Sequence, residues 1–418
     1  MLKLLASALA LLLLTSSATA EEFDSQKAWA ELEDALITRY VYLHDAGFDA
    51  PALLYRTRET AARFTTKESF LNFAQQFVRR FHDPHLNLGP YDPTDYAIIP
   101  TGSDMWAVQV GDTFVLEDVK GHGAADKAGI RPGFEVLSID GLAPRDAIAK
   151  VMSTPFDSLS TDQATYALNI SLAGIRRQPR TLIFSHQGKQ MRCTLPSSYD
   201  HPDALAEGPP ITSRRHGKVG YIRLENSAGR DDTVAAFEKA LDELSDTSGL
   251  VIDLRNIPSG GNTSVGRPVL GHFTRSEQVY QIYQTPEGDT PYYKTEPVLD
   301  KIKPVAPYYD RPVVVLVGRW TGSMGEGMAV GFDTLGVKAV VGAPMADLLG
   351  AVTQVELPTS GGRLELGVGR IYRADMTCRE DYVPTEVVIP ADRGARGEDP
   401  ALERALEILG DPNAEEQP

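Results

Sequence analysis

The sequence predicts an α/β fold for its second half, because short apolar strands alternate there with helix-like segments. Strand-like runs lie at residues 219–224, 250–254, 312–318 and 339–342, and residues 231–244 have helical spacing. This alternation favours a mostly parallel sheet with covering helices. The segment 278–307, rich in Tyr, Pro and Thr, has the composition of a loop or lid. Residues 401–409 have the pattern of a closing helix before a polar tail.

Composition limits the size and the partners of the protein. The chain has 418 residues, of which 42% are hydrophobic and 23% charged, so it can bury sizeable cores and should form two or three domains. The formal net charge of -16 disfavours nucleic acid and anionic membranes as partners.

The first twenty residues have the pattern of a secretory signal peptide. Lys3 precedes an apolar run over residues 4–14, and a small-residue end at 18–20 predicts cleavage near Ala20. No later stretch is long and apolar enough to span a bilayer. We therefore expect a soluble protein that is periplasmic or secreted.

Helical spacing recurs between this segment and residue 82. The apolar positions that repeat with this spacing are Trp29, Leu32, Leu36 and Tyr40, and then Phe70, Phe73, Phe77 and Phe81. We expect both stripes to be core, with Thr65 and Glu68 as a capping box for the second helix. Pro84 ends that helix and leaves His82 and His85 on a stiff turn.

A serine lies where a strand is expected to meet a helix. Trp-Thr-Gly-Ser-Met-Gly-Glu-Gly at 320–327 follows the run 312–318 and precedes a helix-like stretch at 328–335. The free N–H groups of a helix start can stabilise negative charge near the hydroxyl of Ser323, although serine is also a common helix cap. Thr321 excludes the Gly-x-Ser-x-Gly nucleophile elbow.

A glycine-rich turn follows an earlier strand. Residues 249–254 lead into Gly260 and Gly261, whose backbone N–H groups can face an oxyanion. Together, Asp-Leu-Arg-Asn at 253–256, Gly-Gly-Asn at 260–262 and Thr-Gly-Ser-x-x-Glu at 321–326 resemble the core of the tail-specific (C-terminal processing) serine peptidases. The resemblance implies a crotonase/Clp-protease-like core. It also implies that Ser323 is the nucleophile and that the N–H of Met324 and of Gly260 or Gly261 hold the oxyanion.

Residues 123–141 have the pattern of a PDZ-like unit. They favour a short helix over 124–128, a glycine stop, a Pro-Gly turn, a strand and an Asp-Gly turn. This segment resembles PDZ domains of bacterial envelope proteases, which take an extended peptide as an added strand; the alternative is a structural spacer. The expected organisation is a signal peptide (1–20), a helical domain (21–95), a PDZ-like domain (103–200), the catalytic α/β core (212–392) and a C-terminal helix with its tail (393–418).

The general base must be sought away from the serine. The better known branch of the family has a lysine about 25 residues after the serine, but residues 346–350 read Ala-Asp-Leu-Leu-Gly, and Lys338 comes too early. A histidine base is therefore needed if the protein is an enzyme. Asp-Pro-His at 83–85 is similar to the Asp-x-His segment of the tricorn-core branch, which implies His85 as the base, with His82 as its competitor.

A third catalytic group would orient the histidine. Arg-Glu at 379–380 aligns with the late glutamate of the tricorn-type relatives, so the resemblance implies Glu380 in this role. Asp381 is a rival, and an exposed loop acid without a catalytic role is the alternative.

The residues give no sign of a metal or cofactor. Neither cysteine is spaced like a zinc ligand, and no phosphate loop or dinucleotide fingerprint occurs. Cys193 and Cys378 could pair in an oxidising compartment or remain separate thiols.

The expected function is that of an exported serine peptidase that cleaves peptide or protein substrates by a Ser-His-Glu mechanism. A non-catalytic peptide- or ligand-binding protein on the same scaffold is the alternative. An enzyme acting on acyl-coenzyme A would share the fold, but the export signal and the lack of a basic phosphate-binding cluster oppose it.

Overall fold

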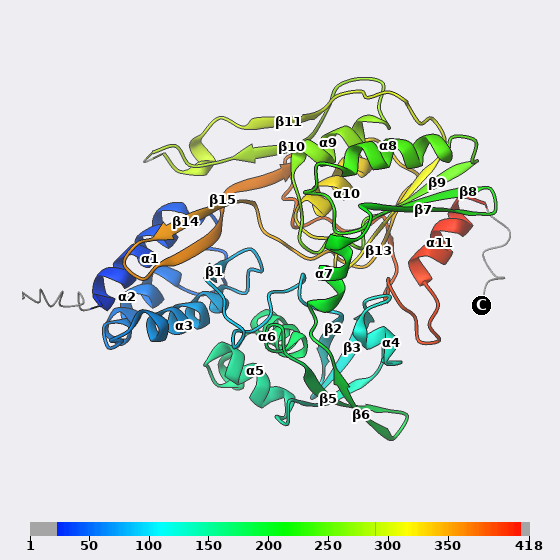
Figure 1. The fold of residues 1–418 in the computed structure, drawn as a ribbon. Coiled ribbons are helices and arrows are strands. Elements are labelled where there is room, and N and C mark those ends of the chain that lie inside the picture. Colours follow the sequence, from blue (N-terminus) through cyan, green and yellow to red (C-terminus); the bar gives the residue numbers. More distant parts are fainter. Residues whose placement is uncertain (1–22, 289, 411–418) are drawn as a thin grey trace, which may run out of the picture.

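The computed structural model describes residues 23–288 and 290–410, which form a mixed α/β structure with three sheets (Figure 1). The expected signal peptide lies outside the described residues. Within the described ranges, no helix combines the length and apolar character needed to cross a membrane.

The central sheet confirms the predicted alternation of strands and helices. Its six strands, in the order β16-β13-β12-β9-β8-β7, are β7 (Ile211–His216), β8 (Val219–Leu224), β9 (Gly249–Asp253), β12 (Val313–Val317), β13 (Ala339–Gly342) and β16 (Glu386–Val387). All neighbours are parallel except β7 and β8. The carboxyl ends of β9 and β12 therefore lie side by side, at the edge where sites of α/β proteins gather.

Helices cover both faces of this sheet. Alternate strand residues pack on one side against α8 (Thr233–Glu243), α9 (Thr263–Gly271) and α10 (Met324–Thr334). The other side packs against α11 (Pro400–Ile408), which is the closing helix predicted from the sequence.

A second, antiparallel sheet lies in the expected PDZ-like region. Its strands are β2 (Met105–Val110), β3 (Thr113–Val119), β4 (Glu135–Ile139), β5 (Arg180–His186) and β6 (Lys189–Leu195). It shares one core with α5 (Pro144–Met152) and α6 (Thr161–Ala173). The short helix α4 (Ala124–Lys127) forms where the sequence predicts it. The helix α7 (Asp200–Glu207) leads on to the central sheet.

The third sheet joins the N-terminal helices to late parts of the chain. Its strands are β1 (Asn87–Gly89), β10 (Gln278–Gln284), β11 (Val298–Ile302), β14 (Ala351–Leu357) and β15 (Gly362–Arg373). One face shares a core with α1 (Ser25–Arg39), α2 (Ala50–Ala61) and α3 (Lys67–Val78). The prediction of a loop or lid at 278–307 was wrong, because β10 pairs with both β11 and β15.

Two local expectations also have clear outcomes. The cap of α3 is Thr66, whose hydroxyl accepts a hydrogen bond from the N–H of Ser69 at 3.2 Å, and not Thr65. Cys193 and Cys378 are both free thiols.

Candidate active site

Ser323 lies on a tight turn between β12 and α10. Its backbone has φ 50° and ψ -106°, a strained conformation for a residue other than glycine, and such strain gathers at functional sites. The carboxylate of Glu326 accepts a hydrogen bond from the N–H of Ser323 at 2.6 Å. The turn is also tied to the segment that follows β9, because the N–H of Gly322 donates to the carbonyl of Ile257 at 3.1 Å. The hydroxyl is thus presented by a firmly held backbone.

The predicted glycine turn packs directly against this serine. Gly260 has φ 71°, and a Cβ atom there would lie 2.6 Å from Cβ and 3.0 Å from Oγ of Ser323. A Cβ atom on Gly261 would lie 2.2 Å from the backbone of Ala228. Both positions therefore require glycine, the first because of its conformation and the serine beside it, and the second because of close backbone packing.

The two glycines differ as donors. The N–H of Gly260 donates to the carbonyl of Ile257 at 3.3 Å. Among the described residues, the N–H groups of Gly261 and Met324 have no hydrogen-bond partner. Of the predicted oxyanion donors, these two are the ones left free to bind an incoming oxygen.

His85 is fixed on the turn between α3 and β1. The carboxylate of Asp83 accepts hydrogen bonds from the N–H of His85 and from the hydroxyl of Tyr40, each at 2.8 Å. The ring Nδ1 of His85 lies 2.9 Å from the carbonyl oxygen of Leu349. Because a carbonyl only accepts, this contact places the ring proton on Nδ1 and leaves Nε2 as a proton acceptor.

Burial keeps this imidazole neutral. His85 is only 7% exposed, and burial lowers its pKa to about 4, although the hydrogen bond to Leu349 opposes the shift. The ring is therefore in the form that can accept a proton at neutral pH.

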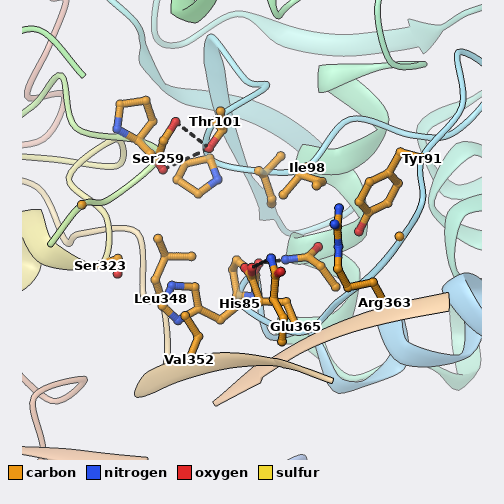
Figure 2. A pocket seen from close by; sticks show the side chains of 18 residues that line it. His85, Tyr91, Ile98, Thr101, Ser259, Ser323, Leu348, Val352, Arg363 and Glu365 are labelled. Carbon is orange, nitrogen blue, oxygen red and sulfur yellow. Dashed lines mark hydrogen bonds between the residues drawn. The ribbon is translucent and has the colours of Figure 1, made fainter. Parts of the chain in front are cut away.

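Ser323 and His85 line the same cavity, of about 360 Å³. Figure 2 shows Ser323, Leu348 and His85 on one side of it, with Ile98, Thr101 and Ser259 across from them. Further lining residues come from the third sheet, namely Asn87, Val352, Gln354, Arg363 and Glu365. The cavity thus lies between the turn that carries Ser323 (the serine turn), the turn that carries His85 (the histidine turn) and the third sheet.

The other predicted residues have different surroundings. His82 lines a separate cavity between the N-terminal helices and the start of α6. Glu380 lies 3.3 Å from Arg370, and the Nδ1 position that it was expected to hold is occupied by Leu349. Lys338 donates to the carbonyl of Ile408, the last residue of α11. The structure thus brings together Ser323, His85, Gly261 and Met324, but gives Glu380 a different partner.

Sequence reasoning missed three contributors to this arrangement. The carbonyl of Leu349 has no sequence signature, since every residue has a backbone carbonyl. Glu326 was visible in the Ser-x-x-Glu pattern, but its contact with Ser323 was not. Arg379 was noted only as the neighbour of Glu380, although its guanidinium donates to the carbonyl of Leu348.

Comparison with known proteins confirms the resemblance to the tail-specific peptidases. Residues 218–388, which include most of the α/β core, match the model of peptidase family S41. The chloroplastic C-terminal processing peptidase of Tetradesmus obliquus is 28% identical over 228 residues, which are 52% of this chain and 44% of that protein. The carboxy-terminal processing protease CtpB of Bacillus subtilis (strain 168) is 29% identical over 188 residues, which are 43% of this chain and 34% of that protein. The matches thus span less than half the length of these curated relatives.

Solved structures resemble nearly the whole chain. Mature CPAF complexed with lactacystin superposes with a TM-score of 0.62 at 16% identity, over 92% of this chain and 96% of that one. The photosystem II D1 C-terminal processing protease gives a TM-score of 0.56 at 18% identity, over 93% and 98%. At these identities the likeness shows a shared fold.

Proposed function

We propose that this chain is an exported serine peptidase, with Ser323 as the nucleophile and His85 as the general base. Ser323 would attack the scissile carbonyl while Nε2 of His85 takes the hydroxyl proton and returns it to the leaving amine. The observation that carries this proposal is one cavity lined by both a strained serine and a neutral histidine whose Nδ1 is already bonded.

The N–H groups of Gly261 and Met324 would hold the oxyanion. Both are free of other partners among the described residues, and preorganised backbone donors of this kind stabilise the charge that develops in acyl transfer. The carbonyl of Leu349 would fix the tautomer of His85. An orienting role for Glu380 stays a prediction, and its present contact with Arg370 favours the Leu349 carbonyl instead.

The surrounding parts fit the same proposal. Residues 103–200 would act as a PDZ-like domain beside a crotonase-like core, and would present an extended peptide or protein substrate to the cavity. The segment 1–20 would direct export, with cleavage near Ala20 and a periplasmic or secreted mature protein. The matched relatives are named as carboxy-terminal processing proteases, and this chain would act on peptide or protein substrates of a similar class.

The test combines proteolysis with chemical labelling. Purified protein is incubated with a chemically unfolded protein and, separately, with a fluorophosphonate that phosphonylates activated serines. Ser323→Ala should lose cleavage by roughly 10⁴- to 10⁶-fold and lose all labelling, as expected for removal of a nucleophile. The control Ser248→Ala changes an exposed serine whose hydroxyl donates to the carbonyl of Lys218, and this variant should keep both cleavage and labelling. A wild-type protein that binds peptides but is neither labelled nor active would instead establish the non-catalytic binding function.

A further inference from the structure

Arg379 is a buried cation between the serine turn and the segment that holds His85. Its side chain is 6% exposed. The guanidinium donates to the carbonyl of Leu348, lies 3.4 Å from the carbonyl of Ser323, and is 3.7 Å from a carboxylate oxygen of Glu326. A planar guanidinium can serve several such partners at once, which a lysine ammonium on a flexible stem does less well.

Glu326 joins the same two segments from the other side. Besides the N–H of Ser323, its carboxylate accepts hydrogen bonds from the N–H of Asp347 at 3.0 Å and from the N–H of Leu348 at 3.2 Å. The ion pair of Glu326 and Arg379 therefore joins the serine turn to residues 347–348. Glu326 accepts from the N–H groups of both segments, and Arg379 contacts a carbonyl of each. Buried ion pairs need this kind of full hydrogen bonding to be tolerated.

The next residue along the chain reaches the base. The carbonyl of Leu349 contacts Nδ1 of His85 at 2.9 Å, directly after the residue whose carbonyl Arg379 holds. A continuous set of contacts thus runs from the backbone of Ser323 through Glu326 and Arg379 to the ring of His85.

We propose that Arg379 is a positioning residue, which with Glu326 sets the placement of the Leu349 carbonyl, and hence of His85, relative to Ser323. This inference rests on the proposed peptidase function. It assigns to residue 379 a task that a guanidinium fork performs better than the single ammonium of a lysine. A shift of about 1 Å between a base and its nucleophile can cost roughly 100-fold in rate.

The charge of Arg379 gives a second, independent readout. Burial dominates the pKa of His85, Glu326 and Asp347, but in each case the guanidinium lowers the pKa. Its removal should therefore raise all three pKa values. The other charged groups around this cluster are Asp83 on the histidine turn, Arg370 on β15, Glu380 and Asp381 beside Arg379 itself, and Arg319 before the serine turn. The rate should fall at low pH as one of these three groups becomes protonated, and we call this fall the acid limb. Without Arg379 the acid limb should lie at higher pH, whichever of the three groups causes it.

The experiment compares Arg379→Gln and Arg379→Lys with the wild type. The control is Arg373→Gln, which removes a half-buried arginine of β15 that pairs with Asp333 at 3.5 Å. For each protein we would measure kcat and KM on an unfolded substrate, the rate of fluorophosphonate labelling between pH 3 and 9, and thermal unfolding. Labelling of the wild type that is lost in Ser323→Ala establishes the proposed function separately from this inference.

Arg379→Gln should lower kcat and the labelling rate by roughly 100-fold with KM nearly unchanged, and should move the acid limb to higher pH. Arg379→Lys should keep the wild-type acid limb, because the charge remains, but recover only part of kcat. Arg373→Gln should match the wild type in all respects. The inference is overturned if Arg379→Gln loses activity with an unmoved acid limb, if the loss is in KM, or if Arg373→Gln loses as much. If Arg379→Gln does not fold, Arg379→Lys provides the test. A wild-type kcat in Arg379→Lys also overturns the inference.

Discussion

The two halves of the candidate site are built in different ways. Ser323 and Gly260 follow β12 and β9, two neighbouring parallel strands whose register runs from the pair Val313 and Leu250 to the pair Leu316 and Asp253. His85 instead sits on a turn beside the three-residue strand β1, and its contacts come from Asp83, Leu349 and, through them, Tyr40. The serine half thus lies on two turns that follow neighbouring strands of one sheet, whereas the histidine half is assembled from distant segments.

This difference indicates where the catalytic geometry is most easily lost. The serine turn is held by strands that are buried along their whole length. The histidine depends on a few side-chain and backbone contacts across the third sheet and the N-terminal helices. We therefore expect substitutions around the serine to act through steric fit, and substitutions around the histidine to act through orientation and protonation.

Among the variants that test this difference, the largest loss of activity is expected for His85→Ala, and it should distinguish His85 from His82. Loss of a general base should lower kcat by about 10²- to 10⁴-fold, because the serine hydroxyl is a poor nucleophile until its proton is removed. His82→Ala removes a ring that lines another cavity and should retain most activity. Steady-state cleavage of an unfolded protein by both variants decides between them. The opposite ranking would show that the histidine turn rearranges in solution.

Gly260→Ala tests the serine half through its packing. The added Cβ atom would lie 2.6 Å from Cβ of Ser323, so the serine must move, and we expect a loss of roughly 100-fold in kcat. The matched control is Gly129→Ala. Gly129 has φ 78° but no heavy atom within 4 Å of an added Cβ. Both variants should lose about 1 to 2 kcal/mol of stability from the left-handed backbone, but only Gly260→Ala should lose activity. Equal activities would show that the serine turn tolerates displacement.

The same contrast explains what the sequence could predict. The parallel core, the serine at a helix start and the glycine turn follow from patterns within a few residues of each other. The pairing of β10 with β11 and β15 was missed, because the composition of 278–307 hides strands whose partners lie far along the chain. In the site, His85 was found by its resemblance to a family segment. The carbonyl of Leu349 and the contacts of Arg379 arise only on folding, and a backbone carbonyl has no sequence signal.

The pH dependence of labelling compares the two halves by their ionisable groups. His85 must be neutral to act as a base, and burial lowers its pKa to about 4, below the ordinary value of about 6.5. Labelling should therefore persist to well below pH 6.5 and fall about tenfold per unit below pH 4, while circular dichroism checks that the fold survives. Burial raises the pKa of Glu326, in the serine half, to about 7. If the labelling rate instead falls with a midpoint near pH 7, and this midpoint disappears in Glu326→Gln, protonation of Glu326 and not of His85 determines the pH profile.

The smallest effect is expected for Glu380→Gln, which tests whether the histidine half has a carboxylate orienter. The side chain of Glu380 is 19% exposed and lies 3.3 Å from Arg370, while Nδ1 of His85 already contacts the carbonyl of Leu349. A partly exposed ion pair contributes at most about 1 kcal/mol, so kcat should fall by no more than about fivefold. Asp381→Asn serves as the neighbouring control and should behave alike. Single-turnover cleavage would measure both, and a much larger loss of turnover confined to Glu380→Gln would mean that the glutamate replaces the carbonyl as the partner of His85 when substrate is bound.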